Sequence, residues 1–227
     1  MSRQQTARLA IAAAMLGTTL AGCVTVEQEM QAQVAAIPEA QRAYIAGSFR
    51  IACLARKEKC HAPFNSLSVF YRNKANAQQF GRLGVSEGGF GGNTVYDFVD
   101  PANAEKGIYF CQSLPAGDYS LHSYRYWNYD GGGNGYNLRE EHQFDVPFRA
   151  NAGEVLSVGD IKLTYEEGKS LLGLKMIVPG VVELSPGDAA DTQAALAKCA
   201  EAVRGLPLRT APLQAPAGGH PLVVAKP

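Results

Sequence analysis

The sequence predicts a mainly β protein, an antiparallel β-sandwich with one α-helix near the C-terminus packed on it. From Ala43 onward, apolar residues recur at every second position, which is typical of strands with one buried face. Glycine, proline and asparagine separate these stretches, and no helical pattern stands between them. Short strands joined by turns indicate a sandwich of two sheets.

The strands are predicted from their alternation. The first covers residues 43–53, where Phe49, Ile51 and Cys53 share one face. The second covers residues 66–72 and places its apolar side chains, Leu67, Val69 and Tyr71, on one face. Further strands are predicted over residues 94–100, 107–114, 118–129, 139–148, 154–165 and 171–180.

Turn residues set the ends of these strands. Pro101 ends one strand, Pro115–Asp118 forms a tight reversal, and Asn151–Gly153 forms another. Pro147 lies inside an otherwise regular strand, which predicts an edge strand or a bulge because proline cannot donate to a ladder.

One helix is predicted after the strands. Ser185 can serve as its N-cap, with Asp188 and Asp191 as alternatives, and Gly205 ends it. Its apolar stripe consists of Ala195, Leu196, Cys199, Ala202 and Val203. The proline-rich segment 206–227 is expected to be an ordered strap at first and then a loose tail.

The N-terminus carries an export pattern. Arg3 and Arg8 precede an apolar stretch over residues 9–20, and small residues lead to Cys23. This resembles a bacterial lipoprotein signal peptide, in which the cysteine thiol is acylated and becomes the new N-terminus. A membrane-spanning helix would need about 20 apolar residues. An ordinary cleaved secretory peptide is the alternative, because small residues before Cys23 suit that cleavage too.

The residues after Cys23 indicate the final location. Val24 and Thr25 follow it, whereas enteric lipoproteins retained in the inner membrane carry an aspartate there. We therefore expect a lipid anchor in the outer membrane, facing the periplasm. The expected layout is a signal peptide (1–22), a tether (23–42), a β-sandwich domain with its helix (43–205) and a proline-rich tail (206–227).

Composition excludes one class of partner. Two of the 21 basic residues lie in the signal peptide, which leaves 19 against 21 acidic residues. Such a balanced surface offers no electrostatic basis for binding nucleic acid.

The remaining four cysteines are predicted to form disulfides, since an exported chain folds in an oxidising compartment. Three connectivities are possible. We favour Cys53–Cys60, which closes a short polar loop, and Cys111–Cys199, which ties a strand to the helix. No close cysteine or histidine pairs are spaced as zinc ligands.

The Cys111–Cys199 pairing follows from alternation in residues 107–114. Ile108, Phe110 and Leu114 are expected to point inward, so Cys111 faces outward, where a packed helix can meet it.

Two segments carry a family resemblance. LPAGDYSL and the later FRANAGEVLSVGDIKL resemble motifs of a group of uncharacterised bacterial lipoproteins with a transthyretin-like (prealbumin-like) β-sandwich. The resemblance covers roughly residues 65–180 and implies a fold and an envelope location, with no catalytic residues. The matching positions are Pro115, Gly117, Tyr119, Gly153, Leu156, Gly159 and Ile161, of which Leu156 replaces the aromatic usual in the group.

Two strings match functional motifs in part. Gly84–Gly88 reads G-x-S-x-G, which would make Ser86 a nucleophile with His122 or His142 as base. That chemistry needs a helix after the serine, whereas glycines and a further strand follow, so we interpret the string as a glycine loop.

The second string begins at Asp130, with Asn134 and Glu141 at the fifth and twelfth positions of a calcium loop. Position three is Gly132, and the flanks are predicted strands. A β-hairpin that requires glycines is therefore favoured, and we predict no metal site and no cofactor.

An aromatic hairpin is the predicted binding surface. Its candidate residues are Tyr124, Tyr126, Trp127, Tyr129, Asp130, Asn134 and Tyr136. Such rings can stack on a sugar or an apolar partner surface, or instead pack over the sheet edge and the helix. The sequence thus predicts a non-enzymatic, lipid-anchored envelope protein that uses this hairpin to bind another envelope component or to serve as a structural accessory. The alternative is a glycan-binding module for peptidoglycan or surface polysaccharide.

Overall fold

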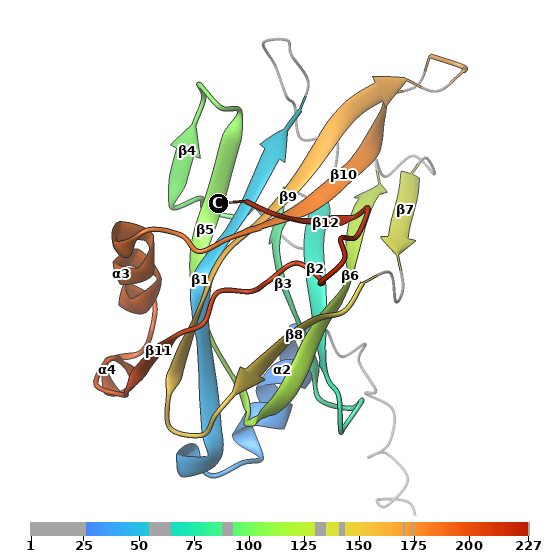
Figure 1. The fold of residues 1–227 in the computed structure, drawn as a ribbon. Helices are drawn as coiled ribbons and strands as arrows, with labels where there is room; N and C mark the ends of the chain where they lie inside the picture. The colour runs from blue at the N-terminus through green and yellow to red at the C-terminus, as the bar shows by residue number, and fades with distance from the viewer. Residues whose placement is uncertain are drawn as a thin grey trace, which may run out of the picture.

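Two β-sheets face each other across an apolar core in the computed structural model of the chain (Figure 1). The structure describes residues 26–54, 65–87, 93–129, 135–140, 144–169, 171–173 and 175–226. The mainly β architecture predicted from alternation is therefore confirmed.

The larger sheet has the strand order β12-β10-β9-β1-β5-β4, with β11 paired to β9. Its strands are β1 (Arg42–Cys53), β4 (Phe98–Asp100), β5 (Glu105–Pro115), β9 (Val155–Lys169), β10 (Lys175–Ser185), β11 (Leu208–Thr210) and β12 (Val223–Ala225).

The smaller sheet has the order β3-β2-β6-β7, with β8 paired to β6. Its strands are β2 (Ser66–Asn73), β3 (Phe80–Ser86), β6 (Gly117–Tyr129), β7 (Gly135–Glu140) and β8 (Val146–Ala150). The described helices are α2 (Val26–Ala35), the 3₁₀ helix η1 (Glu39–Gln41), α3 (Ala189–Ala197) and α4 (Glu201–Arg204).

The larger sheet is mixed, whereas the sequence analysis predicted antiparallel sheets throughout. β9 runs parallel to β1, β11 parallel to β9, and β12 parallel to β10. All strands of the smaller sheet lie between β1 and β9 in the chain, so β9 returns beside β1 from the opposite sheet. A connection of that length permits parallel pairing, which a tight hairpin does not.

The alternation in the first two strands correctly identifies the core. Phe49 and Ile51 of β1 and Leu67, Val69 and Tyr71 of β2 are all buried between the sheets. These inward faces follow from a period of two residues, because successive side chains of a strand point to opposite faces.

β3 was not predicted, because its glycines were interpreted as a loop. Leu83 and Val85 of β3 point into the core. The glycines of β3 leave room for closely packed neighbours. A Cβ at Gly81 would overlap the ring of Tyr71, and one at Gly84 would overlap the Leu67 carbonyl. The predicted strand 139–148 is likewise divided into β7 and β8.

The predicted turns are confirmed. β5 ends at Pro115 and β6 begins at Gly117, and the Tyr119 hydroxyl donates a 2.7 Å hydrogen bond to the Pro115 carbonyl. Gly153 has a φ of +73°, which favours glycine. Pro147 lies in β8, which in the described part of the chain pairs with β6 alone and is thus an edge strand.

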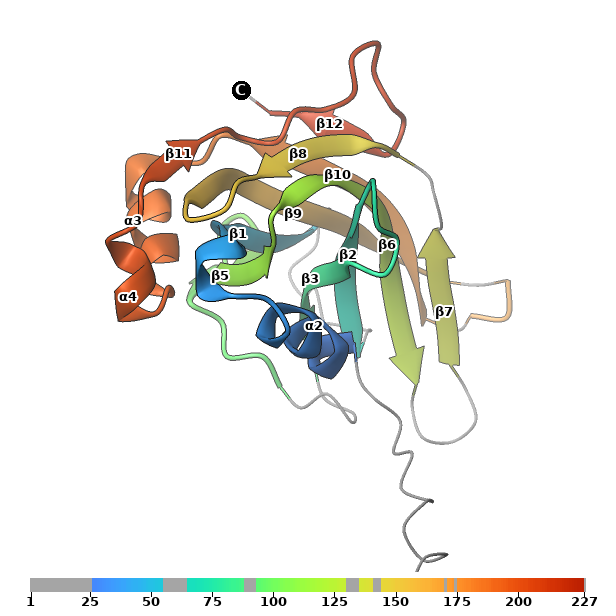
Figure 2. The same cartoon turned by 90° about the horizontal axis from the view of Figure 1, so that it is seen from below.

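Helix α2 packs on the fold, although it lies in the segment expected to be a tether. It lies beside β3 and β5 (Figure 2) and contacts both. Met30 is buried at the edge of the core. Met30 is the one buried side chain among residues 28–35 of α2, so the helix has almost no apolar stripe and the sequence pattern did not reveal this packing.

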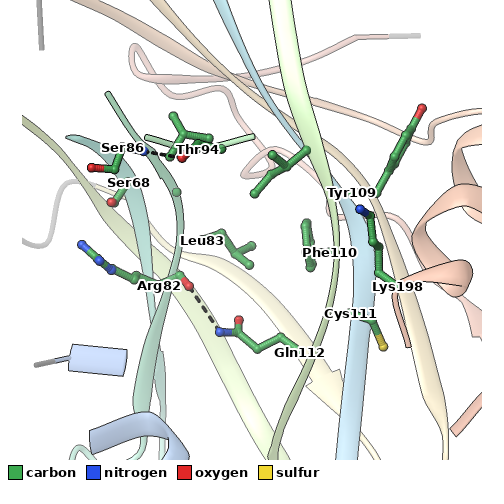
Figure 3. Close-up of a pocket in the computed structure, with 13 residues that line it drawn as sticks. Ser68, Arg82, Leu83, Ser86, Thr94, Tyr109, Phe110, Cys111, Gln112 and Lys198 are labelled. Carbon is green, nitrogen blue, oxygen red and sulfur yellow. Dashed lines mark hydrogen bonds between the residues drawn. The ribbon is translucent and has the colours of Figure 1, made fainter. Parts of the chain in front are cut away.

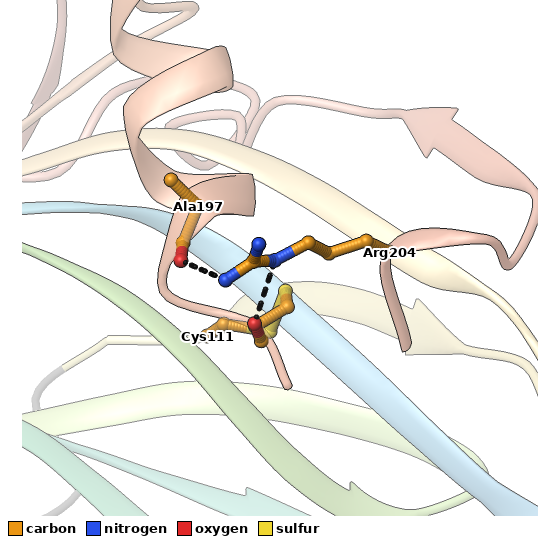
Figure 4. Close-up of a disulfide and its surroundings, with 4 residues drawn as sticks. Cys111, Ala197 and Arg204 are labelled. Atoms are coloured by element: carbon orange, nitrogen blue, oxygen red, sulfur yellow. Dashed lines mark hydrogen bonds between the residues drawn. A yellow bond between two sulfur atoms is a disulfide. The ribbon is translucent and has the colours of Figure 1, made fainter. Parts of the chain in front are cut away.

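The C-terminal helical segment is two short helices instead of one. Asp188 is the N-cap of α3 and accepts a 2.7 Å hydrogen bond from the Asp191 amide. The helix then tightens, since the Cys199 amide donates to the Leu196 carbonyl, three residues back. Arg204 donates to the carbonyls of Ala197 and Cys199 that this break leaves free (Figure 4).

The predicted Cys111–Cys199 disulfide is confirmed and joins β5 to the segment between α3 and α4 (Figure 4). It lies in a second apolar cluster between α3, α4 and the outer face of the larger sheet, made of Tyr44, Ala46, Val155, Ala195, Cys199 and Val203. Cys53 is also disulfide-bonded. Cys60 lies outside the described residues, so the Cys53–Cys60 pairing stays a prediction.

The C-terminal strap is ordered as far as Lys226, so the expectation of a loose tail was wrong. β11 pairs with β9 and β12 with β10, while Leu213 and Val223 are buried. These isolated apolar residues among prolines hold the strap across the larger sheet, a role that composition does not indicate.

Gly47 and Gly205 make a matched pair for a stability test. A Cβ at Gly47 would overlap the Gly159 carbonyl, where the β1–β9 ladder shifts register. Gly205 has open space around its Cα and a φ of −84°. We expect Gly47→Ala to lower the free energy of unfolding by about 2–3 kcal/mol and Gly205→Ala to raise it by about 0.5 kcal/mol. Urea unfolding of both variants tests this, and equal effects would contradict it.

The Cys111–Cys199 bond spans 88 residues. A closed loop of that length restricts the unfolded chain, so we expect the double variant Cys111→Ala/Cys199→Ala to lose about 4 kcal/mol of stability. The urea midpoint of the oxidised protein measures this loss. The wild-type protein under the same oxidising conditions is the reference, and an unchanged midpoint in the double variant would argue against the constraint.

Candidate functional site

A pocket of about 450 Å³ lies where the open edges of the two sheets meet (Figure 3). We call it the edge slot. Its walls are residues 82–86 of β3 and 108–112 of β5, with Ser68, Thr94 and Lys198 at its margins.

The slot exists because both strands lack a neighbour on one side. Among the described strands, β3 pairs with β2 alone. β5 pairs with β1 along its length, but β4 covers its other edge only over residues 105–107. Within the described chain, the edge of β5 beyond Gly107 therefore faces the slot without a strand partner.

A connecting segment closes one end of the slot. The Ser86 amide donates to the Thr94 hydroxyl and the Thr94 amide donates to the Ser86 carbonyl, both at 2.7 Å. On the β5 side of the seam between β3 and β5, the Asp97 carboxylate accepts a 2.8 Å hydrogen bond from the Tyr109 amide. This segment thus crosses from β3 to β5.

A glutamine closes the other end. Gln112 of β5 donates to the Arg82 carbonyl of β3 at 3.5 Å and accepts from the Tyr71 hydroxyl at 3.0 Å. Beyond this bridge, helix α2 covers the seam. The slot is therefore short, bounded at both ends and open to the side.

The lining is apolar at its base and polar at its margins. Leu83, Val85 and Phe110 belong to the core, whereas hydroxyls and two cations lie at the margins. Lys198 pairs with Asp97 at 2.5 Å. No histidine or carboxylate lines the described slot.

The structure does not bring Ser86 and His122 together. The Ser86 hydroxyl donates a 2.9 Å hydrogen bond to the Asn65 carbonyl. Ser86 lies level with Trp127 through β2, and His122 is five positions further along β6, about 17 Å away along the strand. His142 lies outside the described residues.

Two of the predicted binding rings are core residues, so that part of the prediction was wrong. Tyr124 and Tyr126 are 2% and 0% exposed, and the Tyr126 hydroxyl donates to the Thr164 carbonyl. After a register shift between Leu121 and Ser123, alternation along the rest of β6 directs both rings inward and leaves Trp127 half-buried on the outer face. For Asp130 and Asn134, and for the side chains of Tyr129 and Tyr136, the prediction lies outside the described residues.

The calcium alternative also falls outside the described part, because its loop residues Asp130, Asn134 and Glu141 are not covered. Among the residues that the structure does describe, no group of three or more histidine, cysteine, aspartate or glutamate side chains could hold a metal ion.

An ion-pair network lies under α3, and the sequence did not predict it. Arg50 of β1 contacts Glu105 at 3.1 Å and Asp191 of α3 at 2.6 Å, and its guanidinium lies over the Phe98 ring. Its only sequence signal is that Arg50 alternates with core residues in a central strand. The network fastens α3 to the outer face of the larger sheet.

Asp160 is the most buried acid of this network. It accepts a 2.7 Å hydrogen bond from Ser48 and lies 3.5 Å from Arg50. Burial raises the pKa of Asp160 above its usual value, although Ser48 and Arg50 favour the charged form.

Comparison with known proteins gives no family. No protein-family model matches the chain, and no curated protein matches it. A leucine-rich repeat protein from Bacteroides thetaiotaomicron VPI-5482 is similar in structure over 57% of this chain and 15% of that chain, at 11% identity and a TM-score of 0.33. A likeness this distant carries no argument. In the described part of the chain, every helix is too short or too polar to cross a bilayer.

Asp160 predicts a pH dependence of stability. Because its folded pKa is raised, the folded state binds more protons than the unfolded state at pH values above the unfolded pKa of about 3.9. The stability of the wild-type protein relative to Asp160→Asn should therefore fall as the pH rises through the folded pKa. Urea unfolding of both proteins between pH 3.5 and 7 measures the difference.

Asp145 is a control with the opposite sign. Hydrogen bonds from Ser120 and Lys74 lower the pKa of Asp145. The stability of the wild-type protein relative to Asp145→Asn should consequently rise with pH over the acidic range, and parallel trends in the two variants would contradict the assignment.

Proposed function

We propose that this chain is a lipid-anchored, non-enzymatic protein of the cell envelope that binds an extended segment of another envelope protein in the edge slot. The observation that carries the proposal is the juxtaposition of two sheet edges, residues 82–86 and 108–112, around a pocket of about 450 Å³.

An extended peptide fits an unpaired edge because it can continue the ladder. Alternate residues of β5 present their amides and carbonyls to the slot. Asp97 already holds the Tyr109 amide, so an added strand would pair with the remaining main-chain groups. Alternate side chains of that strand would lie over Leu83 and Phe110. Residues 108–112 span about 16 Å, which corresponds to a segment of about five residues.

Helix α2 supports the idea that the seam accepts chain segments. It lies over the continuation of the same seam and contacts both β3 and β5, burying Met30 against the core. One part of the seam is thus filled from within the chain, and the edge slot is the part left open.

Acylation of Cys23 would place the fold close to the outer membrane, facing the periplasm. Because α2 begins at Val26 and packs on the fold, at most about 10 Å of chain separates Cys23 from the domain. The α2 end of the seam would then lie nearest the lipid. The transthyretin-like resemblance is supported by two facing sheets, with α3 and α4 in place of a single helix.

The alternative is a glycan-binding module that uses the aromatic hairpin. Trp127 is the ring on the outer face that favours it. Since Tyr124 and Tyr126 belong to the core, the hairpin offers less stacking surface than the sequence predicted, and the edge slot is the better candidate. Sedimentation with peptidoglycan that disappears in Trp127→Ala would support the glycan module instead.

Photo-crosslinking from two positions of the C-terminal helical segment tests the proposal. Lys198 is exposed at the margin of the slot, whereas Gln193 of α3 is exposed away from it. With a photoreactive residue at position 198, we expect one crosslinked envelope protein of defined mass in cells that carry an intact Cys23. Position 193 should yield none.

A variant that fills the slot provides a second test of the proposal. Ile108→Trp places a larger side chain at the base of the slot, and we expect it to abolish the crosslink from position 198 while thermal unfolding shows that the fold persists. Equal crosslinking from positions 193 and 198, or a crosslink that survives in folded Ile108→Trp, would refute binding in the slot.

A further inference from the structure

A second pocket, of about 740 Å³, lies on the smaller sheet away from the edge slot. Its walls come from the end of β2 and the loop after it, from β6, from residues 144–145 before β8, and from the C-terminal strap. Residues far apart in sequence therefore converge on it.

Basic residues outnumber acidic residues in this pocket. Arg72, Lys74, His122 and His220 line it, and Asp145 is the acidic residue among the described lining. The Asp145 carboxylate is already engaged, because the Lys74 ammonium lies 3.1 Å from it and the Ser120 hydroxyl donates to it. The described lining of the pocket therefore offers no other carboxylate to pair with Arg72.

Arg72 also has an unused donor. Its side chain is half-buried, and its Nε is buried without a hydrogen-bond partner among the described residues. A buried donor of a charged group is costly when it is unpaired. A carboxylate or phosphate in the pocket can pair with the guanidinium, because two of its oxygens can accept parallel hydrogen bonds from the planar N–H groups of arginine.

The remaining walls are apolar. Ala77, Phe144 and Pro216 line the pocket beside the cations, and the His220 ring lies edge-on to Phe144 at 6.2 Å. The volume is within the range of small-molecule sites, and far larger than a bare inorganic ion requires. An occupant should therefore combine an anionic group with an apolar body.

We propose that this pocket binds a small organic anion whose carboxylate or phosphate group is held by Arg72, with its apolar body against Phe144. The pocket shares no lining residue with the edge slot. Anion binding in the pocket and partner binding in the slot can therefore be tested separately.

Titration of the mature chain with three probes tests the site. Benzoate and phenyl phosphate carry the two anionic groups on the same ring, and benzyl alcohol is the neutral control. We expect calorimetry to detect binding of at least one anion and at least tenfold weaker binding of benzyl alcohol. The anion that binds more tightly identifies the headgroup.

Two arginine variants localise the binding. Arg72→Gln should weaken the anion at least tenfold, whereas Arg149→Gln, which removes the same charge from an exposed position on β8, should leave the affinity unchanged. If thermal unfolding shows that Arg72→Gln is not folded, Arg72→Lys replaces it, since lysine keeps the charge but loses the paired donors and should still weaken binding severalfold. Absence of binding by either anion, equal binding of benzyl alcohol, or equal losses in the Arg72 and Arg149 variants would overturn the proposal.

Discussion

Strand β1 is buried on both faces and paired along both edges, and most of the structure depends on this. Its inward residues Phe49 and Ile51 enter the core between the sheets, while Arg50 on the other face anchors α3. Antiparallel β5 and parallel β9 flank it, and Gly47 permits the approach to β9. A charged side chain can occupy such a position only with several partners, because desolvation without them is prohibitive.

The same arrangement explains where binding surfaces are left. Helices α3 and α4, the disulfide and the ion pairs cover the outer face of the larger sheet near β1 and β5, so that face is committed to structure. Openings occur instead where pairing stops. β4 is too short to cover β5, and β3 ends the smaller sheet, so their edges meet at the slot. The second pocket, which contains Arg72, forms where the C-terminal strap reaches the smaller sheet.

Much of the fold could be predicted from local pattern, and the errors have identifiable causes. Alternation gave the inward faces of β1 and β2, and it also placed Cys111 opposite Cys199. The predictions were wrong where one residue type occurs in two different structural settings. Glycines at 81 and 84 are turn signals by composition but here make room for neighbours in a strand. Tyr124 and Tyr126 suggest a binding surface by their number, yet their spacing of two places both in the core.

Neighbouring residues along the chain therefore specified the strands, the turns and the orientation of most side chains, because backbone sterics and a two-residue period act locally. Such local patterns do not determine which distant strands pair with each other. The parallel return of β9 beside β1, the packing of α2 and the strap, and the convergence of Arg72 and His220 on one pocket all depend on contacts between segments far apart in the chain. Those contacts are selected by the burial of apolar surface in the whole fold, which no short stretch of sequence contains.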